Sequence, residues 1–370
     1  MVRRVEIGRS MRMGINAALN SAREGYRQTG VSRYIGELID GIERVKDPHD
    51  QLLVLGQDTG PIKDSPIARI LWEQSLLPVS IATQRLDVFH APIGAVPLLS
   101  GTPSVVTVHD LAYLRFPEQL PKNRRAWLIA ATRMSARRAA KIITVSQATA
   151  NDLQEWLDVP DDRIQAIPLA PSGKVKRIEG KSLDVFRMKW NVEHPYVLAV
   201  GTLEPRKNLP TLLRAFAKIK DDIEHDLVLV GPEGWLTGEL KATLEELHLG
   251  NRVRLTGFVS DEELGGWYSG ADLFAFPSHY EGFGLPGIEA MLCGAPVLCS
   301  DNSAFPEVVG DAGVLIPAAD MNAWADSMLE LLRDETKRQE LQQRGFIRAS
   351  QFSWDRTAQE TYDVYKAVAR

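Results

Sequence analysis

The chain has 370 residues, of which 44% are hydrophobic and 25% are charged, and its formal net charge is −5. This length predicts two domains of roughly 150–200 residues each, and the composition excludes a disordered protein. Residues 1–180 hold 24 basic and 19 acidic side chains, whereas the remainder holds 19 and 29. This imbalance is too small to indicate a nucleic-acid-binding protein.

No apolar run approaches the roughly 20 residues that a membrane-spanning helix needs. The N-terminal residues are basic but lack the apolar core of a signal peptide, so we expect a cytoplasmic protein. The two cysteines, Cys293 and Cys299, lie in apolar surroundings and are predicted to be buried free thiols.

Short apolar runs rich in β-branched residues recur along the chain, separated by segments of helical length. Such runs are typical of strands buried on both faces of a parallel sheet. In the first half the predicted strands are 13–18, 51–56, 87–90, 104–109, 141–146 and 163–168. In the second half they are 196–201, 226–231, 252–256, 272–277, 296–300 and 313–317. The two series predict an α/β protein with two doubly wound, Rossmann-like domains facing a central cleft.

The predicted domains are residues 1–180 and residues 181–353. Segment 171–194 is charged and has no strand pattern, which favours a linker between them. Residues 354–370 are predicted to form a C-terminal helix that packs back on the first domain. Because ligands of open α/β sheets bind beyond the carboxyl ends of the strands, the residues after each strand are the candidates for function.

A glycine-containing loop, GYRQTGVSRY (25–34), precedes a helix predicted to start near Gly30. Glycine at a loop-to-helix junction lets the backbone approach a phosphate closely. The loop alone is a weak indication, and it is not the G-x-G-x-x-G fingerprint of a dinucleotide site.

His109 and Asp110 follow the fourth predicted strand. Asp110 is expected to cap the next helix, and His109 to point into the cleft as a hydrogen-bonding group. The alternative is a histidine with a purely structural role.

Segment 122–141 carries seven basic residues and no acidic one. At helical spacing, Trp127, Leu128 and Met134 lie beside several arginines, and a helix of this type can lie on an anionic membrane surface. The hypothesis is peripheral association with the inner face of a membrane. An ordinary packed helix with a solvated basic face is the alternative.

Adjacent cations follow the strand at 196–200, in the sequence GTLEPRKN (201–208). Arg206 and Lys207 at the mouth of a cleft can neutralise a departing diphosphate and so take the place that Mg²⁺ has in other enzymes. Exposed basic residues before a helix are common, so this segment is only moderately specific.

The strongest signal is EGFGLPGIE (281–289), which follows the strand ending at residue 277. A short helix is predicted at about 285–293, and Gly282 and Gly284 expose backbone N–H groups at its start, a favourable site for phosphate. Glu281 and Glu289 flank this N-terminus and suit sugar hydroxyls on either side of a diphosphate. The alternative is a glycine-rich turn with two structural acids.

Taken together, these segments resemble the retaining glycosyltransferases of family 4, which have the GT-B fold, and especially bacterial mannosyltransferases. The similar segments run nearly from end to end: TGVSRY (29–34), LWEQSLLP (71–78), TVHDL (107–111), ITVSQATANDL (143–153), GTLEPRKNL (201–209) and EGFGLPGIEAMLCGAPVLCSDNSAFPEVVGDAG (281–313).

The resemblance implies an acceptor-side first domain and a donor-side second domain. Glu281 would contact the donor hexose and Glu289 the ribose hydroxyls, Arg206 and Lys207 would bind the phosphates, and His109 would lie beside the transferred sugar. Gly30 would close on the phosphates, and the segment with Phe258 and Val259 would hold the nucleobase. The backbone groups expected to line the sugar and diphosphate belong to Phe283, Gly284 and Leu285.

One departure concerns position 202. Several members of the family carry an arginine just after the glycine that matches Gly201, whereas this chain has Thr202. Neutralisation of the phosphate charge would then depend more on Arg206 and Lys207.

The resemblance implies a hexosyltransferase that uses a nucleotide-sugar donor and a glycan or lipid-linked acceptor, with no metal or other cofactor. Mannose from GDP-mannose is the first expectation, and UDP-hexoses or other GDP-hexoses are the alternatives. Retention would proceed by front-face attack, since no dedicated nucleophile pattern is present. Other classes with two such domains are non-catalytic nucleotide-sugar binding proteins, epimerases and phosphorylases.

Overall fold

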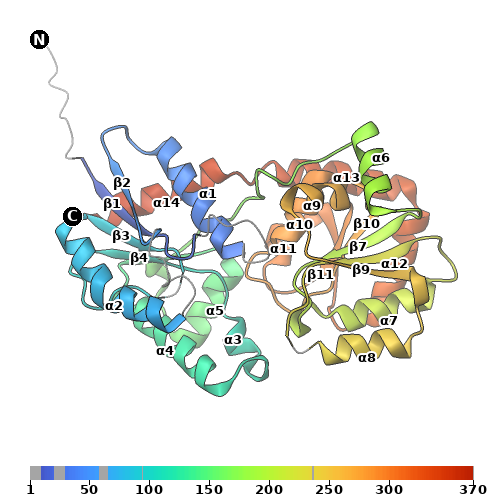
Figure 1. Ribbon diagram of the computed structural model, residues 1–370, viewed down its shortest axis with the longest axis horizontal. Helices are drawn as coiled ribbons and strands as arrows, with labels where there is room; N and C mark the ends of the chain where they lie inside the picture. Colours follow the sequence, from blue (N-terminus) through green and yellow to red (C-terminus); the bar gives the residue numbers. More distant parts are fainter. Residues whose placement is uncertain (1–9, 21–29, 58–65, 94, 236, 370) are drawn as a thin grey trace, which may run out of the picture.

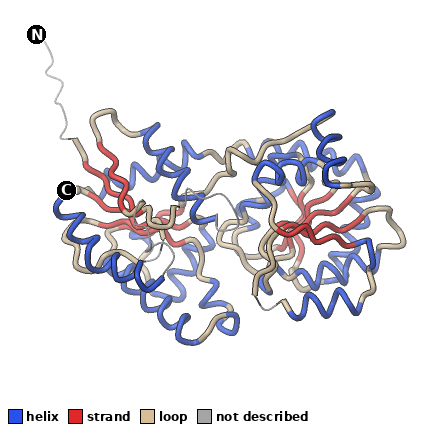
Figure 2. Tube along the Cα trace, viewed as in Figure 1, coloured by secondary structure: helices blue, strands red, loops and turns tan. Residues whose placement is uncertain are grey.

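A computed structural model describes residues 10–20, 30–57, 66–93, 95–235 and 237–369. The described chain forms two lobes, each built around one parallel sheet with helices packed against it (Figure 1). Figure 2 shows the two sheets as separate bundles of strands surrounded by helices. The predicted α/β class with two Rossmann-like domains is confirmed.

The first sheet has six strands in the order β2-β1-β3-β4-β5-β6. They are β1 (Arg12–Asn16), β2 (Gln51–Leu55), β3 (Val88–Ala91), β4 (Ser104–Val108), β5 (Lys141–Thr144) and β6 (Ile164–Ala166). The helices of this lobe are α1 (Gly30–Val45), α2 (Pro66–Thr83), α3 (Ala112–Arg115), α4 (Lys122–Arg138) and α5 (Gln147–Leu157).

The second sheet also has six strands, in the order β12-β11-β10-β7-β8-β9. They are β7 (Tyr196–Val200), β8 (Asp226–Val230), β9 (Val253–Gly257), β10 (Leu273–Phe276), β11 (Val297–Ser300) and β12 (Gly313–Ile316). The helices that follow the first lobe are α6 (Lys181–Trp190), α7 (Leu209–Ile219), α8 (Gly238–Glu246), α9 (Asp261–Ser269), α10 (Leu285–Cys293), α11 (Phe305–Val308), α12 (Met321–Arg333), α13 (Glu335–Ala349) and α14 (Trp354–Val368).

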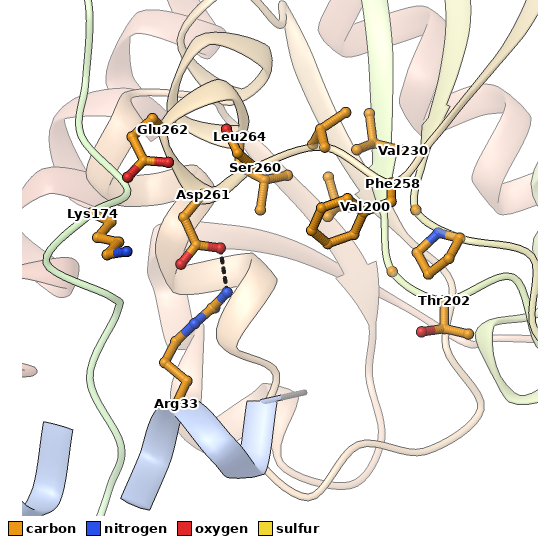
Figure 3. Close-up of a pocket in the computed structure, with 14 residues that line it drawn as sticks. Arg33, Lys174, Val200, Thr202, Val230, Phe258, Ser260, Asp261, Glu262 and Leu264 are labelled. Atoms are coloured by element: carbon orange, nitrogen blue, oxygen red, sulfur yellow. Dashed lines mark hydrogen bonds and ion pairs between the residues drawn. The ribbon is translucent and has the colours of Figure 1, made fainter. Parts of the chain in front are cut away.

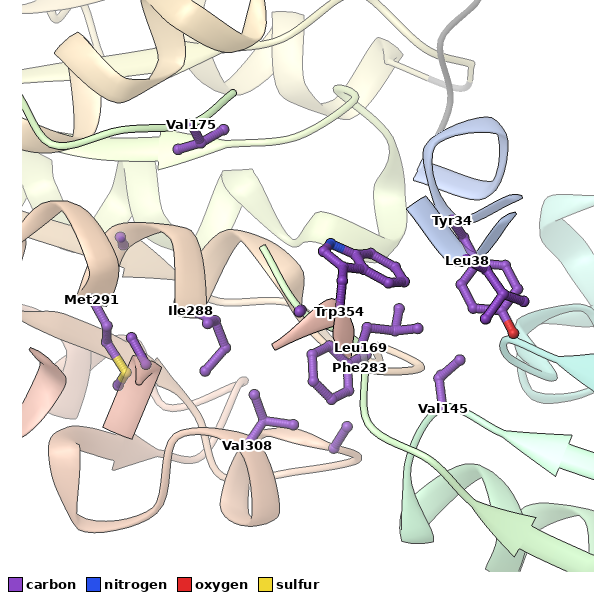
Figure 4. Close-up of a cluster of buried hydrophobic side chains, with 14 of the residues drawn as sticks. Tyr34, Leu38, Val145, Leu169, Val175, Phe283, Ile288, Met291, Val308 and Trp354 are labelled. Carbon is purple, nitrogen blue, oxygen red and sulfur yellow. The ribbon is translucent and has the colours of Figure 1, made fainter. Parts of the chain in front are cut away.

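Each sheet is apolar on both faces, which explains why its strands read as continuous apolar runs. In β4, Val105 belongs to one buried cluster and the next residue, Val106, to another on the opposite face. In β7, Leu198 and Val197 likewise belong to different buried clusters on opposite faces of the sheet. The cluster that contains Val105 and Leu198 is shared by both lobes, and Figure 4 shows Tyr34 of α1 and Trp354 of α14 within it.

All twelve predicted strands are present, but most end one or two residues earlier than expected. Strand β1 ends at Asn16, whereas the apolar pattern continued to Ala18. Ala17 and Ala18 are buried all the same, because the chain turns inside the core after the last ladder bond. A buried apolar residue after a strand therefore does not by itself show that the strand continues.

The segment 171–194, in which the sequence has no strand pattern, contains no strand but does contain the helix α6. Phe186 is the one side chain of this helix that is buried, and its ring packs edge-on against Trp267 at 5.2 Å. A single buried position gives no helical periodicity in the sequence, which is why the pattern did not reveal the helix.

The last helix, α14, returns to the first lobe and packs along α1 (Figure 1). Trp354 Nε1 donates to the carbonyl of Pro171 at 3.0 Å, and Thr357 Oγ1 donates to the carbonyl of Pro168 at 2.7 Å. Further along, Tyr365 Oη lies 2.5 Å from His90 Nδ1 in the first sheet. The C-terminal helix thus ties the end of the second lobe to the first.

Among the described residues, no helix is both long enough and apolar enough to cross a membrane. Cys293 and Cys299 are buried free thiols, as the sequence predicted.

Candidate active site

The segment between β10 and β11 contains the predicted glycine-rich loop and helix. Helix α10 spans Leu285–Cys293, the range that the sequence predicted. Gly284 precedes it with a φ of 95°, a left-handed conformation that favours glycine, and Pro286 lies in its first turn. The first backbone N–H groups of any helix lack helical partners, so this N-terminus can receive an anion.

Glu281 lies in the loop before α10 and contacts two cations from the loop after β7. Lys207 Nζ donates to Glu281 Oε1 at 2.6 Å, and Arg206 Nη1 lies 2.8 Å from Glu281 Oε2. Burial alone would raise the pKa of this carboxyl, but the two cations hold its pKa at about 2. Glu281 is therefore ionised at neutral pH.

The two cations are themselves enclosed. Lys207 is buried, which lowers the pKa of its ammonium group, and Glu281 acts in the opposite direction. The ammonium also lies 4.9 Å from the ring centre of Phe276. Arg206 pairs with Glu204 at 2.7 Å. The two cations and two carboxylates balance each other's charge, so an incoming diphosphate would compete with the carboxylates for Arg206 and Lys207.

Glu289 lies one turn inside α10 and is 3% exposed. It accepts a hydrogen bond from Tyr268 Oη at 3.1 Å, and Arg33 Nη1 lies 3.3 Å from its Oε1. Burial raises the pKa of Glu289, and the Arg33 guanidinium opposes that increase. Glu281 and Glu289 thus lie on either side of the first turn of α10.

His109 follows β4 and reaches the loop of the second lobe. Its Nε2 lies 3.0 Å from the carbonyl oxygen of Pro92, and because a carbonyl only accepts, Nε2 carries the proton. Burial lowers the pKa of His109, so at neutral pH the ring is neutral and Nδ1 is an acceptor. A Cβ placed on Gly282 would lie 1.9 Å from the His109 carbonyl oxygen. The two lobes therefore touch beside Glu281.

Asp110 is not the N-cap of α3, which corrects the sequence prediction. Leu111 occupies the cap position, and no side chain caps this helix. Asp110 Oδ1 instead accepts a hydrogen bond from the backbone N–H of Ala112 at 3.0 Å. An aspartate that accepts a hydrogen bond from the amide two residues ahead forms a local turn, and Asp110 makes this turn in place of a helix cap.

A cavity of about 470 Å³ opens at the carboxyl ends of β7, β8 and β9 (Figure 3). Its apolar wall includes Val200, Val230 and Phe258, and its charged side includes Asp261 and Glu262 of α9. Arg33 reaches it from α1 in the first lobe and points toward Asp261. The remaining lining residues are Lys174, Gly201, Thr202, Gly231, Pro232, Val259, Ser260 and Leu264.

Both parts of the chain match known families. Residues 29–170 match the family described as Glycosyltransferase Family 4, and residues 181–348 match the family described as Glycosyl transferases group 1. O-antigen chain mannosyltransferase B from Escherichia coli is 36% identical over 268 residues, which cover 72% of this chain and 70% of that protein. The chain belongs to glycosyltransferase family 4. It is therefore a hexosyltransferase, as the sequence predicted.

Solved structures with a similar fold cover almost the whole glycosyltransferase. Sucrose-phosphate synthase from Thermosynechococcus elongatus superposes with a TM-score of 0.76, at 22% identity, over 97% of this chain and 99% of that chain. HepE from Anabaena, solved in complex with UDP and glucose, has a TM-score of 0.73 at 19% identity and covers 96% of this chain and 100% of its own. At these identities the similarity shows the GT-B fold alone.

The fold of this glycosyltransferase brings several predicted site residues together. Arg206 and Lys207 contact Glu281, and His109 faces the same loop from the first lobe. Phe258 and Val259 line the neighbouring cavity. The side chain of Phe283 is buried, and its ring packs against Phe352 with the ring centres 5.7 Å apart.

Gly30 and Leu285 are less directly placed. Gly30 begins α1 and is exposed, and a Cβ added to it would meet no described residue within 4 Å. The loop at 25–29 that precedes it lies outside the described residues. Leu285 is the first residue of α10 and is partly buried against the shared core.

Sequence reasoning did not identify four charged residues that line the cavity, namely Arg33, Lys174, Asp261 and Glu262. Arg33 lies within the TGVSRY segment that carried the resemblance, one turn after Gly30, and this placement was a usable signal. Asp261 and Glu262 also begin a helix, where acidic residues are common for purely local reasons. Their presence there did not distinguish a ligand site from helix stabilisation.

Proposed function

We propose that this glycosyltransferase transfers mannose from GDP-mannose to a glycan or lipid-linked acceptor, with retention and without a metal ion. The observation that carries the proposal is the pair Arg206 and Lys207, which converge on Glu281 beside the N-terminus of α10. Two cations and a helix N-terminus can stabilise the diphosphate that leaves when the sugar is transferred. A divalent metal ion is then not required for that step.

Retention is proposed to follow front-face attack. The bond between the anomeric carbon and the β-phosphate oxygen breaks as the bond to the acceptor oxygen forms on the same face. The acceptor's proton passes to the departing phosphate. A covalent route would need a free carboxylate nucleophile, whereas both oxygens of Glu281 lie within 2.6–2.8 Å of cations. The environment of Glu281 favours the front-face route.

Glu281 is proposed to bind the donor hexose and Glu289 the ribose, with His109 beside the transferred sugar. The neutral ring of His109 presents Nδ1 as an acceptor for a sugar hydroxyl. The nucleoside is placed in the cavity of about 470 Å³ whose wall includes Phe258. Mannose is preferred as the hexose because of the similarity to the O-antigen mannosyltransferase, with GDP-mannose as its proposed donor, and UDP-glucose, with which HepE from Anabaena has also been solved, is the alternative.

Calorimetric titration with GDP, UDP, ADP and their sugar conjugates in EDTA tests the donor and the metal together. We expect GDP and GDP-mannose to bind more tightly than the other nucleotides, with affinity unchanged by EDTA. Preferential binding of UDP would reassign the base. Binding that EDTA abolishes would contradict metal independence, and absence of binding to every nucleotide would contradict the transferase site itself.

A non-catalytic nucleotide-sugar binding protein is the alternative from another class. Slow hydrolysis of the donor, or transfer to any acceptor, would exclude it. Incubation with labelled GDP-mannose in EDTA, with and without candidate acceptors, measures both hydrolysis and transfer.

We further propose that the first lobe docks on an anionic membrane surface through α2 and α4, which pack into the same buried cluster on one face of the first sheet. Helix α2 exposes Ile67, Leu71, Leu76 and Val79. Helix α4 exposes Trp127 and Met134 among its arginines, and no acidic residue occurs from 119 to 151. Apolar side chains flanked by cations suit the interface of an anionic bilayer.

Flotation with phosphatidylglycerol-containing vesicles tests this surface. We expect the wild type to float with anionic vesicles and to remain behind with phosphatidylcholine alone. The double variant Leu71→Ser/Leu76→Ser should lose flotation, because it removes two exposed apolar side chains. The matched control is Val185→Ser/Met188→Ser on α6, whose side chains are equally exposed. Equal flotation of both double variants would contradict the proposed surface.

A further inference from the structure

Arg33 connects the two lobes at the cavity. It projects from α1 of the first lobe, and its guanidinium forms ion pairs with Asp261 at the start of α9 and with Glu289 on α10 (Figure 3 shows the Asp261 contact). Its side chain is only 19% exposed. A single residue of the first lobe thus contacts two carboxylates that the second lobe places at or beside the cavity.

Glu289 depends on this contact because burial and the nearby Asp261 disfavour its charge, which only Arg33 and the hydrogen bond from Tyr268 favour among the described neighbours. It is almost fully buried, which raises its pKa, and Asp261 raises the pKa further. The titratable groups that face it are Arg33 from α1, Asp261 and Tyr268 from α9, and Cys293 from α10 itself. Within the described residues, Arg33 is the only cation among them. The helix α13, which also packs on α10, contributes uncharged Gly345 there.

The same contact depends on how the lobes are arranged. Asp261 and Tyr268 belong to the same lobe as Glu289 and remain near it in any arrangement, whereas Arg33 moves with the first lobe. Separation of the lobes would therefore leave Glu289 beside another carboxylate without its cation. An uncompensated buried carboxylate takes up a proton or recruits water, and either change weakens it as an acceptor for ribose hydroxyls.

We propose that Arg33 is a positioning residue through which the first lobe orients Glu289 and balances its charge at the nucleoside cavity. The inference rests on the proposed function, in which Glu289 accepts hydrogen bonds from the ribose. It goes further by making tight binding of the nucleoside depend on a residue of the opposite lobe.

The experiment measures the affinity for GDP by calorimetry, and kcat/KM for transfer, across about pH 5 to 8 in the wild type and Arg33→Ala. Removal of the cation should raise the pKa of Glu289, so the acid limb of both profiles should move to higher pH by about one unit. Near the acid limb this corresponds to about tenfold weaker binding. A residue with only a structural role would lower activity without moving the limb.

Three further variants make the test independent of folding losses. Arg33→Lys keeps the charge and should return the limb toward its wild-type position. Asp261→Asn removes a charge that raises the pKa of Glu289, so its limb should move to lower pH. Arg44→Ala, on the same helix in an exposed ion pair with Asp355, should match the wild type.

Superimposable acid limbs for the wild type, Arg33→Ala and Asp261→Asn would overturn the inference while leaving the proposed function intact. Failure of the wild type to bind any nucleotide would instead overturn the proposed function, and the inference would fall with it. If GDP is not the nucleotide that binds, the same series is measured with the one that does.

Discussion

Replacement of Lys207 by alanine is expected to lower kcat at least about a hundredfold. One well-placed cation or oxyanion donor typically lowers the barrier by about 3–4 kcal/mol, and Lys207 is one of two such cations beside α10. Its ammonium group is held at 2.6 Å from Glu281 and lies 4.9 Å from the centre of the Phe276 ring, which fixes its position. The variant also leaves Glu281 paired with Arg206 alone.

The effect should appear in kcat more than in KM, because the charge on the leaving phosphate increases in the transition state. Steady-state transfer assays with saturating acceptor measure both constants. The matched control is Lys218→Ala, an exposed lysine of α7 in the same lobe, which should retain wild-type kcat. Near-normal kcat in Lys207→Ala would remove this residue from the mechanism.

The parts of the structure that the sequence predicted are those set by local rules. The twelve strands follow from apolar runs buried on both faces, and the bounds of α10 follow from Gly284, Pro286 and Gly294. These residues act on their own backbone, so their meaning does not depend on distant parts of the chain. The segment 281–289 could therefore be recognised as a helix N-terminus flanked by two acids.

The parts that the sequence did not predict depend on contacts between distant segments. Arg33 and Glu289 are 256 residues apart, and nothing local indicates that they form an ion pair. Helix α6 likewise packs on the second lobe through Phe186, which contacts Trp267, and one buried side chain produces no periodic apolar pattern in the sequence. Asp110 shows a further limit, since a cap and an Asx turn use the same residue type and only the backbone geometry decides between them.

Two residues of the second lobe, Tyr280 and Glu307, hold the lobes together by making two hydrogen bonds each to the first lobe. Tyr280, the residue before Glu281, donates to Asp152 of α5 at 2.6 Å and accepts from the backbone N–H of Leu111. Glu307 of the second lobe accepts from the first two backbone N–H groups of α5 at 2.9 and 3.0 Å. A carboxylate at a helix N-terminus is favourable, so these contacts stabilise the observed arrangement of the lobes.

The substitution Gly282→Ala should disrupt the observed arrangement of the lobes and reduce kcat on the order of a hundredfold. Gly282 is not among the residues with positive φ, so alanine meets no backbone strain. Its Cβ would, however, lie 1.9 Å from the His109 carbonyl oxygen, and a backbone atom cannot move aside as a flexible side chain can. The lobes must separate by about an ångström, and misplacement of that size can cost a hundredfold in rate.

The same variant should bind GDP with a smaller loss, because most of the cavity belongs to the second lobe and lies away from Gly282. Each lobe keeps its own sheet, so the variant should still fold, with a lower melting temperature because the buried cluster that both lobes share is disturbed. The control is Gly238→Ala at the start of α8, where a Cβ would meet nothing among the described residues. Wild-type kcat in Gly282→Ala would mean that transfer takes place with the lobes further apart, and the contact between His109 and the loop of Glu281 would then have no part in the reaction.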